Sequence, residues 1–183
     1  MRFFHILAVA ALSASLLSSA VRADDELPPE LSPTRPIAEV AAMLAYDYCP
    51  RVLSGTMDVS GSWEVQQLGF AGELLDREEP EFDYPLFMLE ANRFDGKLGF
   101  AGRVQNACEV IVQGENRMTT RTVLREHLIA HPDAFKPEPT LSAAGVETYS
   151  VPTRSGRLLV RLKDNQAETI LQLSVEGCST CRP

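Results

Sequence analysis

Two histidines at helical spacing come nearest to a catalytic or metal-binding pattern in this chain. His127 and His131 stand four residues apart in the segment 116–131, whose apolar residues recur at helical spacing. Histidines at positions i and i+4 can bind zinc from one face of a helix, and a histidine beside a carboxylate can act as a general acid or base. The pair therefore suggests one catalytic hypothesis, a small exported hydrolase that uses His127 and His131 with or without a metal ion.

The pattern around this pair is incomplete. In the HExxH motif of zinc proteases a glutamate stands between the histidines, whereas Glu126 precedes His127. Asp133 is close in sequence but follows Pro132, which ends the predicted helix, so a third ligand is not identified. The simpler interpretation is a partly buried, hydrogen-bonded His127 and a His131 that meets the helix dipole favourably at the carboxyl end. This interpretation predicts neither a metal nor a cofactor.

Three arginines form a row on one flank of the same predicted helix. Arg117, Arg121 and Arg125 follow one another at a spacing of four residues. The planar guanidinium group suits carboxylate and phosphate, so the row is a candidate anion-binding site. The alternative is a solvated helix flank that balances the acidic charge of the protein.

The four cysteines indicate disulfide bonds. An even number of cysteines in an exported protein is typical of a disulfide framework, and four cysteines allow three connectivities. We favour Cys49–Cys108 together with Cys178–Cys181. The first bond would join the end of the leading helix to a central strand and stabilise the fold by about 2–5 kcal/mol. The second closes a short loop, so its entropic contribution is small.

The Cys178–Cys181 pair also has the CxxC spacing of thiol redox proteins. Thioredoxin-like proteins place this motif at the amino terminus of a helix, where the helix dipole lowers the thiol pKa. Here only Arg182 and Pro183 follow, so no helix can begin there. A structural disulfide is the favoured interpretation, and thiol redox chemistry is a further alternative.

The first 23 residues have the layout of a signal peptide. Arg2 precedes an almost unbroken apolar run over residues 6–17, and the small residues Val21 and Ala23 fit cleavage after Ala23. The run is nearer a dozen residues than the roughly 20 that a membrane-spanning helix needs. We therefore expect a signal peptide over residues 1–23, a periplasmic or secreted mature protein, and no stable membrane insertion.

The mature chain is acidic. Fifteen basic and 25 acidic residues follow position 23, which gives a net charge of −10. This charge argues against nucleic acid and anionic membrane surfaces as partners. Residues 24–35 read as a Pro-rich acidic arm, and residues 36–183 as a single domain.

The pattern of elements predicts an α+β fold. Helical spacing predicts helices over 36–49, ended by Pro50, and over 116–131, and a weaker pattern suggests a short helix over 62–68. Strands are predicted over 86–91, 97–103, 108–112, 146–151, 157–162 and 169–175. Tight turns such as Asp95-Gly96 favour antiparallel pairing. We expect a disulfide-containing antiparallel sheet of about five or six strands with the two main helices on one face.

The sequence favours a non-catalytic function. It contains no nucleophile elbow, no phosphate-binding glycine loop and no dinucleotide-binding fingerprint. The leading hypothesis is an exported soluble envelope protein that acts as a binding or interaction module for an envelope protein or a small ligand. The hydrolase and the thiol redox protein are the alternatives.

Overall fold

The computed structural model describes residues 34–57, 59, 70, 86–154 and 156–177. The elements are α1 (Ile37–Met43), η2 (Leu44–Tyr48), α2 (Cys49–Leu53), β1 (Leu86–Arg93), β2 (Gly96–Arg103), β3 (Ala107–Gln113), α4 (Arg117–Ala130), β4 (Lys136–Pro137), η3 (Pro139–Leu141), β5 (Val146–Thr153), β6 (Gly156–Asp164) and β7 (Glu168–Val175). Four predictions lie wholly or almost wholly outside the described residues: the signal peptide over 1–23, the Pro-rich arm over 24–35 except its last two residues, the short helix over 62–68, and the pair Cys178 and Cys181.

The strands form one antiparallel sheet in the order β1-β2-β3-β7-β6-β5-β4. The α+β class, the antiparallel pairing and the two helices are confirmed. The predicted strand number was wrong, because the sheet has seven strands rather than five or six. The additional strand, β4, consists of Lys136 and Pro137 and pairs with Ser150 and Tyr149 of β5. A two-residue strand that contains a proline has no alternation of side chains that a sequence could reveal.

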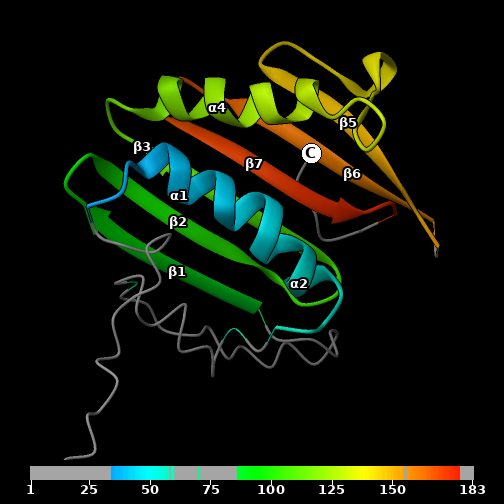
Figure 1. Ribbon diagram of the computed structural model, residues 1–183, viewed down its shortest axis with the longest axis horizontal. Helices are drawn as coiled ribbons and strands as arrows, with labels where there is room; N and C mark the ends of the chain where they lie inside the picture. The colour runs from blue at the N-terminus through cyan, green and yellow to red at the C-terminus, as the bar shows by residue number, and fades with distance from the viewer. Residues whose placement is uncertain (1–33, 58, 60–69, 71–85, 155, 178–183) are drawn as a thin grey trace, which may run out of the picture.

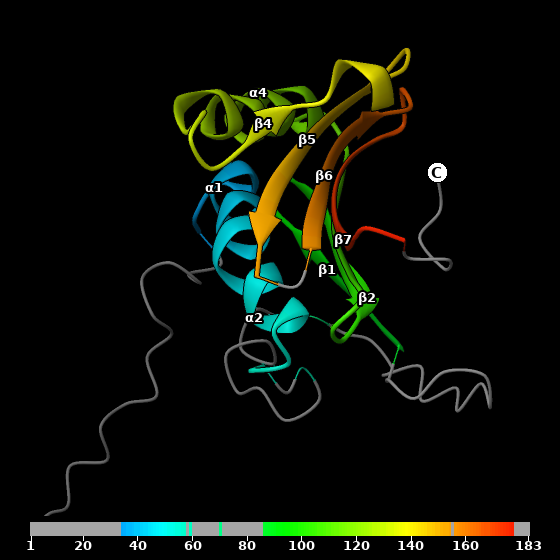
Figure 2. The same ribbon diagram turned by 90° about the vertical axis from the view of Figure 1, so that its right-hand side faces the viewer.

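Both helices lie on the same face of the sheet (Figures 1 and 2). The order of elements repeats, since each helix is followed by a meander of three strands: β1-β2-β3 after the first helix, and β5-β6-β7 after α4. The two meanders meet at the central antiparallel pair of β3 and β7. The opposite face of the sheet carries none of these helices. We call it the second face.

The first helix runs past the proline that we predicted to end it. It continues from Ile37 to Leu53, but its middle segment η2 is a π-helix. Pro50 has no backbone N–H and its ring crowds the carbonyl group four residues earlier, at Tyr46. The wider π turn immediately before Pro50 relieves this conflict, so that Pro50 stands in the first turn of α2.

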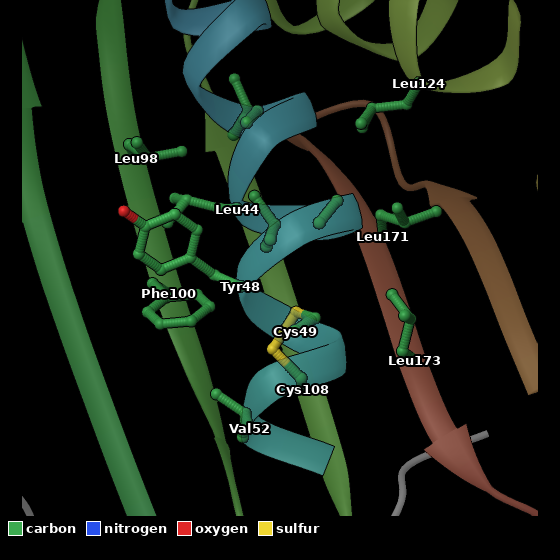
Figure 3. Packing of buried hydrophobic residues seen from close by; sticks show 14 of the residues in the cluster. Leu44, Tyr48, Cys49, Val52, Leu98, Phe100, Cys108, Leu124, Leu171 and Leu173 are labelled. Carbon is green, nitrogen blue, oxygen red and sulfur yellow. A yellow bond between two sulfur atoms is a disulfide. The ribbon is translucent and has the colours of Figure 1, made fainter. Parts of the chain in front are cut away.

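The hydrophobic core fills the space between the helices and the sheet. Leu44, Tyr48 and Val52 point from the first helix toward the sheet, where Phe100 and Leu171 lie opposite (Figure 3). All five side chains are buried. The core therefore depends on the helical stripe that the sequence displays and on the inward residues of β2 and β7.

The disulfide Cys49–Cys108 is confirmed. It joins the start of α2 to β3, with a Cα–Cα distance of 5.5 Å, and both cysteines are fully buried (Figure 3). Because Cys108 lies on the strand next to the centre of the sheet, the bond ties the first helix directly to the core.

The hairpin between β1 and β2 positions both helices. Phe94 and Asp95 form its loop, one residue earlier than the predicted Asp95-Gly96 turn. The Asp95 carboxylate accepts a hydrogen bond from the backbone N–H of Ile37 at 2.7 Å. The backbone carbonyl of Asp95 accepts one from the Asn116 side-chain amide at 3.0 Å. The same loop thus contacts the amino-terminal ends of α1 and α4.

Replacing Asp95 by alanine is expected to lower the free energy of unfolding by about 1–2 kcal/mol, because the first N–H of α1 loses its charged partner. Asp95→Asn keeps an acceptor oxygen and loses only the charge, so we expect about half that cost. Urea denaturation of the two variants measures both values. Equal losses for the two variants would contradict a capping role for the carboxylate oxygen.

Candidate functional site

The two histidines belong to a cluster of stacked rings between the helices, which we call the aromatic cluster: Tyr46, His127, His131 and Phe135. The ring of Tyr46, from the π segment η2, stacks on His127 with the centroids 3.8 Å apart and the planes at 14°. The His131 ring lies 4.4 Å from His127, and Phe135 meets both Tyr46 and His127 edge-on. The Tyr46 hydroxyl donates a hydrogen bond to the Leu124 carbonyl at 2.7 Å.

Two rings of the cluster, His127 and Tyr46, are favoured in their neutral forms. Partial burial lowers the pKa of His127, the nearby His131 lowers it further, and Asp47 acts in the opposite direction. Burial also raises the pKa of the Tyr46 hydroxyl. Nδ1 of His131 lies 2.8 Å from the His127 carbonyl at the end of α4. Within the described residues, no three His, Cys, Asp or Glu side chains gather closely enough to hold a metal ion.

His127 gives stability a defined pH dependence. Its folded-state pKa lies below the ordinary value, so the unfolded chain takes up a proton first as the pH falls. Its contribution is complete above about pH 6.5 and is lost as the pH falls through the folded-state pKa. We therefore expect the urea concentration at the unfolding midpoint of the wild-type protein to decrease when the pH is lowered from about 7.5 to about 5.5.

His127→Phe keeps an aromatic ring against Tyr46 and removes the titrating group, so its urea midpoint should fall less over the same pH range. His131→Gln removes only one of the causes of the shift and should have an intermediate effect. Identical pH profiles for the wild-type protein and His127→Phe would refute the assignment.

The arginine row contacts carboxylates of the neighbouring strands. Arg117 pairs with Asp164 of β6 at 3.3 Å, and Arg121 and Arg125 pair with the two oxygens of Glu147 of β5 at 2.5 and 2.8 Å. The three arginines therefore join α4 to the second meander. An external anion would have to compete with these internal carboxylates.

Glu147 is held as a carboxylate by its neighbours. Partial burial raises its pKa, but hydrogen bonds from Arg125 and Tyr149 and the charges of Arg125 and Arg121 outweigh this effect and leave the pKa below its ordinary value. The Tyr149 hydroxyl donates to Oε2 of Glu147 at 3.1 Å. The contribution of this site is lost only in the acidic range, below the range in which His127 acts.

The second face carries a row of connected polar side chains. Glu109 of β3, Gln172 of β7 and Arg161 of β6 lie side by side in the strand register. The Gln172 amide donates to Glu109, and Arg161 donates to the Gln172 oxygen at 3.4 Å and to Ser174 at 3.5 Å. Gln172 is only 1% exposed. We call Glu109, Gln172 and Arg161 the polar row.

Lys163 lies on β6 two residues after Arg161, on the same face of the sheet. Burial lowers its pKa, Glu109 acts in the opposite direction, and Arg161 adds to the lowering. The middle of the second face therefore combines one carboxylate with two cationic groups that are partly withdrawn from water.

A shallow pocket of about 180 Å³ opens beside the polar row, above β1, β2, β3 and β7. Its space arises at Gly99, which has no side chain between Glu90 and Ile111 in the strand register. The Glu90–Lys97 ion pair, at 2.7 Å, lies on its border. Its lining consists of Met88, Leu89, Glu90, Lys97, Gly99, Phe100, Ala101, Ile111, Gln113 and Glu168. The pocket has an apolar floor and a charged border, and it is large enough for one apolar side chain or a similar small group.

Sequence reasoning missed this face as a site. The alternation of Leu158, Val160 and Leu162 with Leu159, Arg161 and Lys163 was visible in the sequence. The placement of Arg161 beside Gln172 and Glu109 depends on pairing between strands far apart in the chain, which the alternation does not reveal.

Comparisons with protein-family models, with curated proteins and with solved structures found no match. In the described part of the chain, no helix has both the length and the apolar composition needed to cross a membrane.

Proposed function

We propose that the protein is an exported, non-catalytic binding module that holds a partner protein or small ligand on the second face of its sheet. The observation that carries the proposal is the pocket at Gly99, which lies next to the polar row. The pocket receives an apolar group, and the partly exposed Glu109, Arg161 and Lys163 supply hydrogen bonds and charge. The buried Gln172 holds Glu109 and Arg161 in position. A combination of an apolar centre with surrounding polar groups is typical of recognition surfaces.

The organisation of the polar row supports this proposal. Its side chains are linked to one another, so they are held in position before any partner arrives. Preorganised groups lose less conformational entropy on binding than mobile ones. The helices stabilise the sheet from the other side, so the second face is not needed to build the core (Figure 2).

The disulfide supports the proposed location. Bonds such as Cys49–Cys108 persist in oxidising compartments and are rare in the cytosol. We propose that residues 1–23 direct the chain to the periplasm or the medium, and that the mature protein begins at Asp24. Mass spectrometry of the exported protein tests the cleavage site, and alkylation without reductant tests whether Cys178 and Cys181 are paired.

A matched pair of isoleucine variants tests the binding surface. Ile111→Thr alters the floor of the pocket and keeps a β-branched residue in β3, whereas Ile129→Thr changes an exposed isoleucine on α4, on the opposite face. Each tagged protein is expressed in its natural host, cross-linked in the cell envelope and purified. Bound proteins and small molecules are then identified by mass spectrometry. The wild-type protein and Ile129→Thr should recover the same partner, and Ile111→Thr should recover at least about tenfold less, equivalent to about 1.4 kcal/mol.

Equal recovery by both variants would exclude the pocket as the binding surface. A reduced recovery by Ile111→Thr supports the proposal only if circular dichroism and thermal melting show that this variant is folded like the wild-type protein. Turnover in a hydrolase screen that disappears in His131→Ala would instead favour the hydrolase alternative.

A further inference from the structure

The two edges of the sheet differ in how well they are protected from pairing with another chain. At one edge, β4 consists of only Lys136 and Pro137, and short strands with lysine or proline are common devices against edge pairing. At the other edge, β1 has eight residues, Leu86–Arg93, with neither lysine nor proline. Among the described residues, no strand pairs with the outer side of β1.

The register of the hairpin shows which backbone groups β1 directs outward. Arg93 and Gly96 are partners across the two-residue loop, and the pair that closes such a loop exchanges backbone hydrogen bonds. Counting back in twos from Arg93, the N–H and C=O groups of Ala91, Leu89 and Phe87 also face β2. The groups of the residues between them, Met88, Glu90 and Asn92, therefore point away from β2. These groups can pair with another strand.

Two large apolar side chains lie at opposite ends of this edge. Met88, near the start of β1, is 48% exposed, and Phe94, directly after its end, is 73% exposed. In an antiparallel pair of identical strands, the start of one lies opposite the end of the other. A second copy of β1 would therefore bring each Met88 close to the partner's Phe94 and cover both.

We propose that two copies of this chain pair through the outer edges of β1, antiparallel and centred on Ala91, to form one continuous sheet. In this register Glu90 lies opposite the partner's Asn92, and each such pair exchanges two backbone hydrogen bonds. Centring the pair on Glu90 would place two carboxylates opposite each other, which is unfavourable.

The resulting assembly closes after two copies. The contact is isologous, because the same strand serves on both sides, and the remaining edges are the protected β4 strands. The pocket at Gly99 lies beside the contact, so the dimer would carry two pockets on its second face.

Sedimentation equilibrium of the mature protein tests this proposal. We expect the wild-type protein to be dimeric at micromolar concentration. Glu90→Pro removes an outward N–H on an edge strand, where proline is tolerated, and should be monomeric. Glu90→Gln keeps the N–H and is the matched control, so it should remain dimeric.

A second variant protects the test against misfolding. If circular dichroism shows that Glu90→Pro is unfolded, sedimentation of Met88→Lys tests the proposal instead. Met88 is exposed, and a lysine there removes the apolar contact with the partner's Phe94. This variant should dimerise at least about tenfold more weakly than the wild-type protein. A monomeric wild-type protein, or a folded Glu90→Pro or Met88→Lys that dimerises like it, would overturn the proposal. Met88 and Glu90 also line the pocket, so the readout of this test is the mass of the protein and not the recovery of a partner. Ile111→Thr, which leaves β1 unchanged, should remain dimeric.

Discussion

Replacing Cys49 and Cys108 together by alanine is expected to lower the free energy of unfolding by about 4 kcal/mol. The bond spans 59 residues of sequence, and a loop of this length strongly restricts the unfolded chain. The double variant avoids leaving an unpaired thiol in the core. Both positions are fully buried against the sheet, so the lost sulfur atoms also leave space in the packing.

Urea denaturation of the oxidised wild-type protein and of the double variant measures this effect. The matched control is Cys178→Ala with Cys181→Ala, which removes the predicted short loop and should cost less than about 2 kcal/mol. A loss below about 1 kcal/mol for the Cys49 and Cys108 variant would show that the unfolded chain is already compact around this loop.

Replacing Leu44 by alanine is the second large effect, with an expected loss of about 3 kcal/mol. Leu44 is fully buried and lies at the start of the π segment, where it packs against the sheet (Figure 3). The truncation creates a cavity between the first helix and β2, because the disulfide and the stack on His127 prevent the helix from moving inward.

Leu141→Ala is the matched control for this prediction. Leu141 lies in η3 and is 43% exposed, so its truncation should cost less than about 1 kcal/mol. Thermal melting and urea denaturation of both variants check the difference. Similar losses for Leu44→Ala and Leu141→Ala would mean that the first helix can shift to close the cavity.

The histidine pair and the arginine row, the two candidate sites on the second helix, are engaged in contacts within the protein. His127 and His131 face aromatic rings, and the arginine row faces Asp164 and Glu147. These contacts join the helices to each other and α4 to the second meander. The surface that we propose for binding lies on the other side of the sheet and is formed by residues that no sequence motif singled out.

Local patterns in the sequence were sufficient for much of the fold. The second helix was predicted over 116–131 and occupies Arg117–Ala130, and all six predicted strands lie within observed ones. Helical stripes, alternation along strands and turn residues act over a few positions, so they can be read from neighbouring residues. The Cys49–Cys108 pairing was also predicted correctly, because it joined two elements whose positions the pattern suggested.

Other features required the tertiary structure. The π turn before Pro50 places Tyr46 on His127, and the register of β3, β7 and β6 brings Glu109, Gln172 and Arg161 together. The sequence by itself therefore determined which segments become the main helices and the six longer strands and which side of each is apolar, and it favoured the disulfide that the structure contains. Strand order, register and the composition of each face were decided by packing between distant segments, because these depend on contacts that no local pattern encodes.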